Sequence, residues 1–529
     1  MRPIFALAIL FSLLTAAYAG KVEKTYYFSD PTIVRNGDYQ SVSLGGTLLA
    51  GLHGEPMLAY KSVALMLPPG EKAVRLNITL DDRVEVPGTF DLYPQQYARP
   101  LSEGPSGEFI RKAEVYRSAK SYPSVCSGHL MTSYLNGYAF GMTTFTPMVY
   151  IPAERKVYYY RKVTVSILTR ADDTAREALK NLTPSSEALK RVRLFTQNPE
   201  MMTRYPAPST LKTGYQVLVI TPAQFQAGFQ PLIDYYGTRE MAVQVATTES
   251  IASMAGTDLA EKMRNFIIQE YQSNGIEHVI LGGDAEWVPF RGMYCYVVSG
   301  GGYESYNIPA DIYFSALDGN WNTNNNFMWG EPGEDDLLPE ISVGRMSFSD
   351  AGEQANMVHK SVSYQGNPVQ EEMKRPYMVS EFLYDPPLTW GSDYLDLLID
   401  DHSDNGYFTY GIPSVSNQIT KLYDNLGYNW SAGQVISGIN QGKSFIHHCG
   451  HANSNYMMRL YNWDITDANF SQVDGITHNY QLMYTHGCIC GAFDDEDCIA
   501  ERGTAIANWL VGGVFNSRYG WFNQGQTEG

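Results

Sequence analysis

After Tyr215 the sequence alternates between short apolar runs and amphipathic stretches, and this alternation constrains the fold more than any other feature. Helices are expected at about 223–236 and 258–274, between the first strand-like runs. Strands that alternate with helices form βαβ units, in which the strands are parallel. We therefore predict an α/β fold with a mostly parallel sheet flanked by helices, whose strand-like runs lie at 216–221, 242–246, 278–283, 341–344, 377–380, 443–448, 481–486 and 511–516.

The first part of the chain has a different pattern. Residues 21 to about 170 are rich in strand-like runs, and 156–168 alternates with a period of two residues. A charged helical stretch follows near 172–192, and a linker is expected at about 192–212. A chain of 529 residues exceeds what one hydrophobic core usually serves. The prediction is a β-rich domain at 20–204, followed by the α/β domain at 205–529.

The N-terminus has the three parts of an export signal. Arg2 gives a positive start, residues 4–17 are nearly all apolar, and Ala17-Tyr18-Ala19 fits the small-x-small cleavage rule. Residues 1–19 are therefore expected to be a signal peptide, and the mature protein is expected to be secreted or held at the cell surface. No later stretch approaches about 20 apolar residues, so no integral membrane segment is predicted.

The charged residues limit the partners and the metals that this chain can bind. The formal net charge is −18 and no Lys/Arg cluster is present, which excludes nucleic acid, because phosphate binding needs clustered cations. A loop at 316–338 is rich in Asn, Gly, Asp and Glu, and its oxygen atoms could hold a structural calcium ion. No EF-hand spacing is present, and a solvated insertion is the favoured interpretation.

Two strand ends in the second domain carry reactive residues. The run ending at His448 leads into Cys449-Gly450-His451-Ala452, and the run ending at His486 leads into Gly487-Cys488. In open parallel sheets, ligands bind beyond the carboxyl ends of the strands. If the two strands are neighbours, the imidazole of His451 and the thiol of Cys488 emerge side by side.

Such a pair supports nucleophilic catalysis, because a thiol attacks only as its thiolate and an adjacent imidazole takes the proton. Cys488 is then the nucleophile, His451 the general base, and the backbone N–H groups of Gly450, Ala452 and Cys488 an oxyanion hole. The residues alone leave other interpretations open. One is a small buried cysteine beside a satisfied histidine, and another is a zinc site, although no recognised zinc spacing is present. His447 and His448 are expected to be structural, one packing inward and one outward.

Several motifs resemble peptidase family C25, the gingipain-type cysteine peptidases, whose fold is caspase-like. The motifs are ILGGDAEWVP from residue 280, HHCGHANSNYMMRL from 447, THGCICGAFDDEDCIAERGTAIANWL from 485 and VGGVFNSRYGW from 511. The resemblance spans about 215–529. It implies a caspase-like catalytic domain that needs no cofactor for its chemistry.

The resemblance also implies further site residues. Glu381, just after the 377–380 run, takes the place of an acid that orients the histidine ring. Asp393 takes the place of a carboxylate in the pocket for P1, the substrate residue before the scissile bond, which implies a preference for basic P1 residues. Asp393 equally suits the N-cap of a helix that begins at Tyr394. Trp521, the last residue of VGGVFNSRYGW, is assigned to substrate binding with Asp393.

Residues 20–204 are similar to the propeptide of the same family, notably at Gly54-Glu-Pro-Met-Leu and Phe145-Thr-Pro-Met-Val-Tyr. The similarity implies an inhibitory, folding-assisting prodomain that acts as an intramolecular partner. Two departures stand out. Ala452 occupies a position that is glycine in the gingipains, and the chain is expected to be truncated at its C-terminus, because further domains follow in the family.

The leading functional hypothesis is a secreted cysteine endopeptidase that hydrolyses protein or peptide substrates through a thioester acyl-enzyme. A surface sortase or transpeptidase of the same fold is an alternative, since it would use the same nucleophile and pass the acyl group to an amine. A non-enzymatic adhesin with a peptidase-like domain is a third possibility. The presence of both His451 and Cys488 argues against the adhesin.

Overall fold

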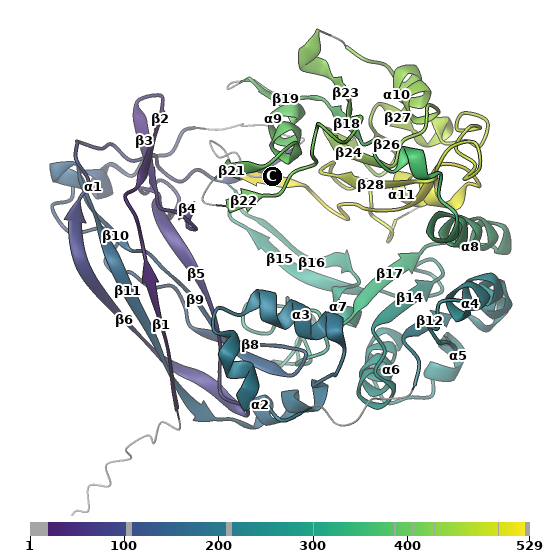
Figure 1. The fold of residues 1–529 in the computed structure, drawn as a ribbon, viewed down its shortest axis with the longest axis horizontal. Helices are drawn as coiled ribbons and strands as arrows, with labels where there is room; N and C mark the ends of the chain where they lie inside the picture. The colour runs from purple at the N-terminus through teal and green to yellow at the C-terminus, as the bar shows by residue number, and fades with distance from the viewer. Residues whose placement is uncertain are drawn as a thin grey trace, which may run out of the picture.

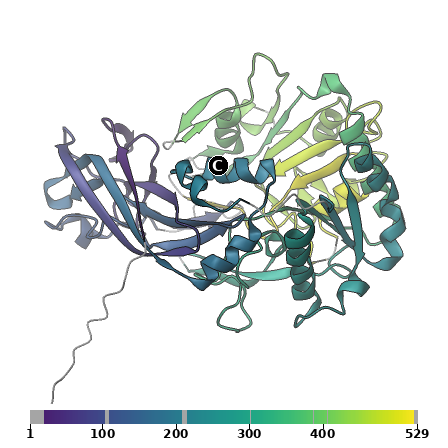
Figure 2. The same ribbon diagram turned by 60° about the horizontal axis from the view of Figure 1, so that its bottom comes forward.

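The computed structural model describes residues 20–101, 108–207, 214–299, 301–385, 388–404, 407–427, 429–495 and 497–523, and the predicted signal peptide at 1–19 lies outside these ranges. A β-rich domain comes first in the chain and packs beside a larger α/β part (Figure 1, Figure 2). Within the described ranges, no helix is long and apolar enough to cross a membrane.

The β-rich domain is a sandwich of two antiparallel sheets. Its core draws Val63 and Leu65 from one sheet and Val163, Val165 and Ile167 from the other, so the predicted period of two places alternate residues inside. The first sheet contains β1 (Gly20–Tyr27), β6 (Glu71–Glu85), β10 (Met148–Ile151) and β11 (Lys156–Ala171). The second contains β4 (Leu48–Ala50), β5 (Leu58–Met66), β8 (Met131–Leu135) and β9 (Tyr138–Phe145). Smaller elements are β2 (Thr32–Asn36), β3 (Tyr39–Ser43), β7 (Ala98–Pro100) and α1 (Ala113–Tyr116).

The segment that joins the two parts is packed for most of its length. Helix α2 (Asp173–Ala178) and helix α3 (Ser186–Phe195) are followed by a 3₁₀ turn at Pro199–Arg204. The linker predicted from residue 192 therefore begins in a helix. One side of α3 faces the α/β part, where the Arg191 guanidinium donates a hydrogen bond of 2.6 Å to the carbonyl of Glu340.

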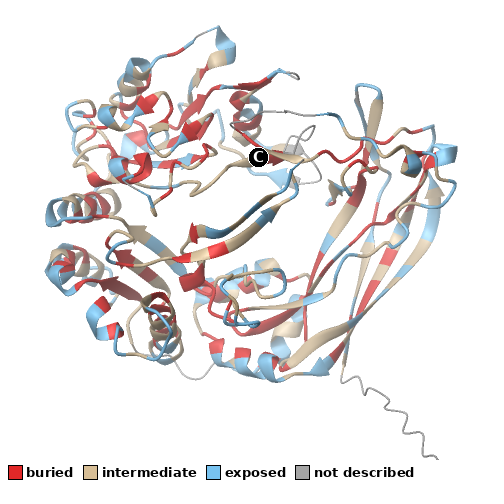
Figure 3. Ribbon diagram, turned by 180° about the vertical axis from the view of Figure 1, so that it is seen from behind, coloured by how far each residue is buried: buried red, intermediate tan, exposed pale blue. Residues whose placement is uncertain are grey.

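The α/β prediction is confirmed, but the parallel strands form two sheets rather than one. In the first sheet the order is β13-β12-β14-β17, with β12 (Val217–Thr221), β13 (Val243–Thr247), β14 (His278–Gly282) and β17 (Ser342–Met346). In the second the order is β23-β18-β24-β28-β29, with β18 (Tyr377–Ser380), β23 (Thr420–Tyr423), β24 (Phe445–Cys449), β28 (Gln481–Thr485) and β29 (Leu510–Val514). Burial is concentrated on the central strands β12, β18 and β24 (Figure 3), as expected for parallel sheets covered by helices.

Helices and hairpins complete the α/β part. Helix α6 (Leu259–Asn274) shows how the sequence sets their ends: the Asp258 carboxylate accepts the N–H of Glu261 at 2.9 Å, and Gly275 ends the helix in the left-handed region (φ 76°). The other helices are α4 (Gln230–Gly237), α5 (Thr248–Ile251), α7 (Ile312–Ser315), α8 (Ala351–Gly366), α9 (Gly391–Leu395), α10 (Ala432–Ile439) and α11 (Ile499–Ala505), with α6 at Leu259–Asn274. The short strands are β15 (Arg291–Val297), β16 (Tyr303–Ala310), β19 (Phe382–Tyr384), β20 (Thr389–Trp390), β21 (His402–Asp404), β22 (Tyr407–Thr409), β25 (Ala452–Asn453), β26 (Tyr456–Met457), β27 (Leu460–Tyr461) and β30 (Trp521–Asn523).

Candidate active site

Strands β24 and β28, whose adjacency the sequence leaves open, are neighbours and run parallel in register. His448 lies opposite Thr485, and the pairing continues beyond the strand end, where the N–H of His486 donates to the carbonyl of His448 at 3.0 Å. The two turns that follow touch, because a Cβ on Gly487 would lie 2.5 Å from the Cβ of Ala452. The residues after these strands therefore share one edge of the sheet.

Cys488 sits on a tight turn and is 1% exposed. The next residue, Ile489, has φ 60°, which is rare for a β-branched residue and marks a strained turn. The N–H of Ile489 donates to the carbonyl of Arg518 at 2.7 Å, which holds the turn against the segment after β29. From that segment the N–H of Gly520 donates to the Cys488 sulfur at 3.3 Å, so a backbone dipole already points at the atom that would carry the thiolate charge.

The contacts of the His451 ring indicate how its protons are arranged. Its Nε2 lies 3.1 Å from the carbonyl oxygen of Phe382. A carbonyl can only accept, so Nε2 carries the proton and Nδ1 keeps a lone pair that can take a proton from a thiol. The backbone N–H of His451 donates to Oε2 of Glu381 at 2.6 Å. The main chain and the ring are thus held by two consecutive residues at the end of β18.

Glu381 lies at the predicted place but makes a different contact from the one expected. The sequence predicts a carboxylate against the far ring nitrogen, whereas that nitrogen faces the Phe382 carbonyl and the carboxylate binds the His451 backbone. Glu381 is 3% exposed, and its oxygens lie 3.9 Å from His448 Nε2 and 3.9 Å from Arg459 Nε. Burial alone would raise the pKa of Glu381, but His448 and the N–H of His451 outweigh it, and the pKa is lowered.

Arg459 links this carboxylate to a second one. Its Nη2 donates to both carboxylate oxygens of Asp424, at 2.7 and 3.0 Å, and the guanidinium stacks over the Trp430 ring at 4.2 Å. Asp424 in turn accepts the N–H of Phe382 at 3.0 Å. Nothing in the local sequence signals this network, because its members come from four separate segments.

The backbone at Gly450 is constrained by the same cluster. A Cβ there would lie 2.5 Å from Glu381 Oε2 and 2.5 Å from His448 Nε2, so only glycine fits. Ala452, the position that departs from the gingipains, is 7% exposed and pairs with Met457 across the hairpin after His451. These contacts place Gly450, Ala452 and Cys488 on the two touching turns.

Apart from His486, which is half-buried, the remaining histidines and cysteines at these two strand ends are buried. His447 and His448 are 8% and 0% exposed, so the prediction that one of them points outward is wrong. The rings of His447 and His486 stack with their Nε2 atoms 3.3 Å apart, and burial lowers the pKa of His447 to about 3. Burial also raises the pKa of the Cys490 thiol to about 12. Among the described residues, no His/Cys group of metal-ligating geometry occurs here.

Asp393 and Trp521 come from different elements, helix α9 and strand β30. Asp393 is exposed on α9, and its Oδ2 accepts the N–H of Trp390 at 2.9 Å as part of the helix cap. Asp393 therefore takes part in capping helix α9, but it does so as the third helical residue and not as the N-cap residue. Trp521 lies on β30, where its ring meets that of Tyr303 at 5.2 Å. Strand β30 pairs antiparallel with β7 of the β-rich domain.

A separate carboxylate cluster lies where the two parts of the chain meet. Ligand atoms of Asp318, Asp336 and Glu340 lie within 4.8 Å of one another, and Asp318 is 9% and Glu340 2% exposed. The Asn181 amide donates to Asp318 at 2.9 Å, and the N–H of Asn136 donates to Glu340 at 3.1 Å. Oδ2 of Asp318 and Oδ2 of Asp336 are buried without a hydrogen-bond partner. Burial raises the pKa of Asp318 to about 6 and that of Asp336 to about 7.

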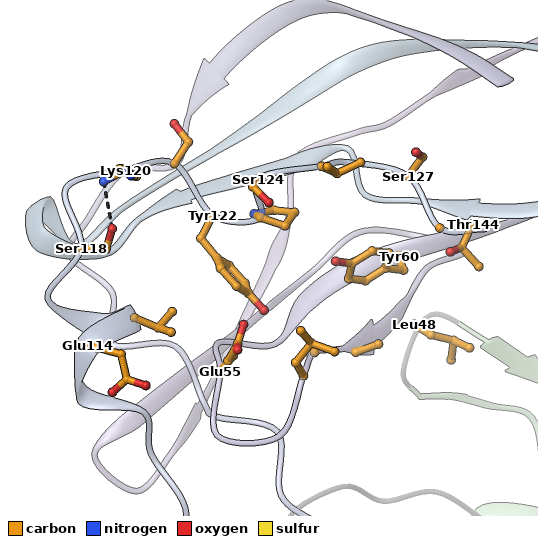
Figure 4. Close-up of a pocket in the computed structure, with 18 of the residues that line it drawn as sticks. Leu48, Glu55, Tyr60, Glu114, Ser118, Lys120, Tyr122, Ser124, Ser127 and Thr144 are labelled. Atoms are coloured by element: carbon orange, nitrogen blue, oxygen red, sulfur yellow. Dashed lines mark hydrogen bonds between the residues drawn. The ribbon is translucent and has the colours of Figure 1, made fainter. Parts of the chain in front are cut away.

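A wide groove also lies in the β-rich domain, away from Cys488. Figure 4 shows Tyr60 and Tyr122 on its walls, with Glu55 at its base. Glu55 forms an ion pair with Lys112 at 2.8 Å, so its charge is satisfied within the domain. The groove has no part in the constellation around Cys488.

Two family models match successive parts of this chain. A model of peptidase family C25 matches residues 210–528, and a model of the C25 propeptide matches residues 27–188. Gingipain R2 of Porphyromonas gingivalis is 22% identical over 371 residues, which are 68% of this chain and 44% of that protein. Lys-gingipain W83 of the same species is 22% identical over 510 residues, 92% of this chain and 26% of that protein, so the chain spans less than half the length of both relatives. The crystal structure of the Arg-specific cysteine proteinase gingipain R aligns with a TM-score of 0.44 and 16% identity, over 59% of this chain and 64% of that one. Because the family model covers more than half of the sequence, the chain belongs to peptidase family C25, with the C25 propeptide ahead of its peptidase domain.

Proposed function

We propose that this chain is the precursor of a secreted cysteine endopeptidase, with Cys488 as nucleophile and His451 as general base. The observation that carries the proposal is the in-register pairing of β24 and β28, which brings the turns bearing these two residues into contact. The export signal read from residues 1–19 supports secretion. Substrates would be proteins or peptides, and no nucleic acid or cofactor enters the reaction.

The reaction would proceed in two halves. Nδ1 of His451 takes the thiol proton, and the thiolate attacks the peptide carbonyl carbon to give a tetrahedral oxyanion. Backbone N–H groups of Gly450, Ala452 and Cys488 stabilise that charge. The C–N bond breaks, the imidazolium gives its proton to the leaving amine, and a thioester remains on Cys488. Water, deprotonated by His451, then attacks the thioester, and the acid leaves as the sulfur regains a proton.

The propeptide domain would keep this enzyme latent. Strand β7 of the propeptide pairs with β30, whose neighbour Gly520 contacts the Cys488 sulfur. Proteases commonly bind extended substrates as an added strand, so a propeptide strand in that place excludes them. Contacts of Asn136, Asn181 and Arg191 with the peptidase domain anchor the rest of the propeptide.

Covalent labelling tests the proposed function. The full-length chain is first processed to release the propeptide and is then incubated with a thiol-reactive peptidyl epoxide, and the modified residue is located by tandem mass spectrometry while hydrolysis of labelled casein is followed. The expected result is modification at Cys488 in step with loss of hydrolysis. Hydrolysis that persists after Cys488 is fully modified would show that the chemistry lies elsewhere. Cys295→Ala, a change at a half-buried cysteine on β15, serves as the control.

We also propose that the cluster of Asp318, Asp336 and Glu340 holds a structural calcium ion. Three carboxylates with two unpartnered buried oxygens supply the hard oxygen ligands that calcium prefers. A cation would also relieve the cost of ionising acids that lie this deep. Asn136 and Asn181 of the propeptide already donate to two of these carboxylates, so the ion would matter more once the propeptide has left.

Thermal unfolding should reveal this ion. Without calcium, stability should fall as pH rises through the raised pKa values of about 6 for Asp318 and about 7 for Asp336, because these buried acids ionise there. Calcium binds the ionised form, so millimolar calcium should raise Tm by about 5 °C at pH 8 and by clearly less at pH 5. Asp318→Asn should abolish the increment, whereas Asp335→Asn beside the cluster should keep it. An equal increment in wild type and Asp318→Asn would rule out this site.

A further inference from the structure

The segment after β29 lies along the turn that carries the nucleophile. The N–H of Gly491 donates to the carbonyl of Asn516 at 3.0 Å, and the N–H of Ile489 donates to the carbonyl of Arg518 at 2.7 Å. These two bonds run from one side of the turn to the other side of the segment, as they do between antiparallel strands. Side chains of residues 516–520 are therefore close enough to bind the backbone of the turn.

The side-chain amide of Asn516 binds the two peptide units that lead into the turn. Its Nδ2 donates to the carbonyl of His486 and to the carbonyl of Gly487, at 3.1 Å in each case. Both neighbours are carbonyl oxygens, which can only accept, so the nitrogen and not the oxygen of the amide faces the turn. The Cys490 sulfur also lies 3.4 Å from the Gly487 carbonyl, but a thiol is a weak donor.

The bond to Gly487 fixes the direction of the Cys488 N–H. The peptide unit between these two residues is trans, and in a planar trans unit the C=O and the N–H point in opposite directions. Because Asn516 holds the carbonyl of this unit, the N–H of Cys488 points away from Asn516. That N–H is one of the three backbone donors of the proposed oxyanion hole.

The preceding peptide unit is held from both sides. Asn516 binds its carbonyl, and its N–H, that of Gly487, donates to Oγ1 of Thr485 at 2.9 Å. The same hydroxyl lies 2.8 Å from Nδ1 of His448 on the neighbouring strand, so this unit is tied to the sheet. The next unit has no such tie to the sheet through its carbonyl, and the Asn516 amide is the strong donor that restrains its rotation.

We infer that Asn516 is a positioning residue for the proposed reaction, and that its amide aims the Cys488 N–H at the oxyanion of the tetrahedral intermediate. The inference rests on the proposed function, since it assigns a role within that reaction. The amide contacts the backbone before the nucleophile and acts through it. An oxyanion donor matters most when charge develops on the substrate oxygen, so the effect belongs in kcat rather than in KM.

Asn516→Ala tests this role in the chain that is expressed in full and then processed. The substrate is a fluorogenic peptide that spans a casein bond cleaved by the wild type. Loss of the amide should lower kcat about 30-fold and leave KM within about threefold, because one oxyanion donor is misdirected. Alkylation of Cys488 by iodoacetamide displaces iodide and forms no oxyanion, so its rate should stay within about threefold of wild type. General damage to the site would slow both reactions.

Two further variants and a control accompany this test, with circular dichroism to confirm folding. Asn516→Asp keeps the size of the side chain but replaces the donor by an oxygen that repels the two carbonyls, so kcat should fall at least as far as in Asn516→Ala. Asn516→Gln keeps the donor on a longer stem and should recover part of kcat. Asn265 of α6 donates through Nδ2 to the carbonyl of Ala255 at 3.0 Å, so Asn265→Ala removes a bond of the same kind beside the first sheet and should leave kcat unchanged.

The outcomes separate this inference from the proposed function. If the folded, processed wild type cleaves no casein bond, or still cleaves after Cys488 is alkylated, the peptidase proposal fails and the inference fails with it. If the wild type works through Cys488 and both Asn516→Ala and Asn516→Asp keep kcat within about threefold, only the role of Asn516 fails. Equal slowing of hydrolysis and alkylation in Asn516→Ala would mean that the amide holds the sulfur and not the oxyanion donor, which would also overturn the inference.

Discussion

Replacing Cys488 by alanine is expected to lower kcat/KM for peptide hydrolysis by on the order of 10⁴-fold or more, with the fold intact. The sulfur is the only atom lost, and alanine fits the same buried position with the Gly520 N–H left facing a small gap. Cys490, two residues along the turn, cannot take over, because burial raises the pKa of its thiol to about 12. The measurement is steady-state hydrolysis of a fluorogenic peptide by the processed protein.

Cys490→Ala is the matched control for this prediction. It removes a sulfur of equal size from the same turn, and activity should stay within a few-fold of wild type. Cys488→Ser should be nearly as inactive as Cys488→Ala, because an alcohol is a far poorer acid than a thiol and His451 alone does not ionise it. Substantial hydrolysis by Cys488→Ala, or its loss in Cys490→Ala alone, would contradict the assignment of the nucleophile.

Replacing Glu381 by glutamine is expected to lower kcat by about 100-fold with little change in KM. The carboxylate accepts the N–H of His451 at 2.6 Å and faces His448 and Arg459, so its charge holds the base-bearing turn in place. Because Glu381 touches the backbone and not the ring of His451, it acts by positioning. The pKa of Glu381 is lowered in the folded state, so its contribution to stability should be lost as pH falls through that pKa. Glutamine cannot ionise and should flatten this acid limb.

The readouts for Glu381 are kcat and KM measured separately, the pH–rate profile and urea unfolding. Glu371→Gln, the same change at an exposed side chain, should leave all of them unchanged. Glu381→Asp should recover part of kcat, because it keeps the charge while shortening the reach. A purely structural role would be indicated if Glu381→Gln lowered stability but left kcat and the pH profile of the folded enzyme untouched.

Much of the fold could be predicted from the sequence, as could the position of His451 and Cys488 just beyond two strand ends, because both depend on local patterns. A parallel strand is a short apolar run, and the residue after it lies at a known edge of the sheet. The division into two sheets could not be predicted in this way, since nothing in β17 or β18 states which neighbour each will have. His447 and His448 point to opposite faces of β24, and both are buried because other parts of the chain cover both faces. The local sequence does not show this covering.

The details that were missed depend on the backbone or on distant segments. The acceptor of the His451 ring proton is the backbone carbonyl of Phe382. Every residue has such a carbonyl, so the sequence does not indicate which one the ring contacts. The loop at 316–338 reads as solvated, yet Asp318 and Asp336 at its ends turn inward beside Glu340. Strands β7 and β30 are three residues each and far apart in sequence, so neither carries a periodic pattern that could reveal their pairing.

The pairing of β7 with β30 also implies that the activity of the cleaved protein should depend on its concentration. While both domains share one chain, the tether keeps β7 at an effective concentration of about millimolar near its site, and dilution changes nothing. Once the connection between the domains is cut, the same contacts become a bimolecular equilibrium governed by mass action. A cleaved precursor would then stay inactive at high protein concentration and become active on dilution.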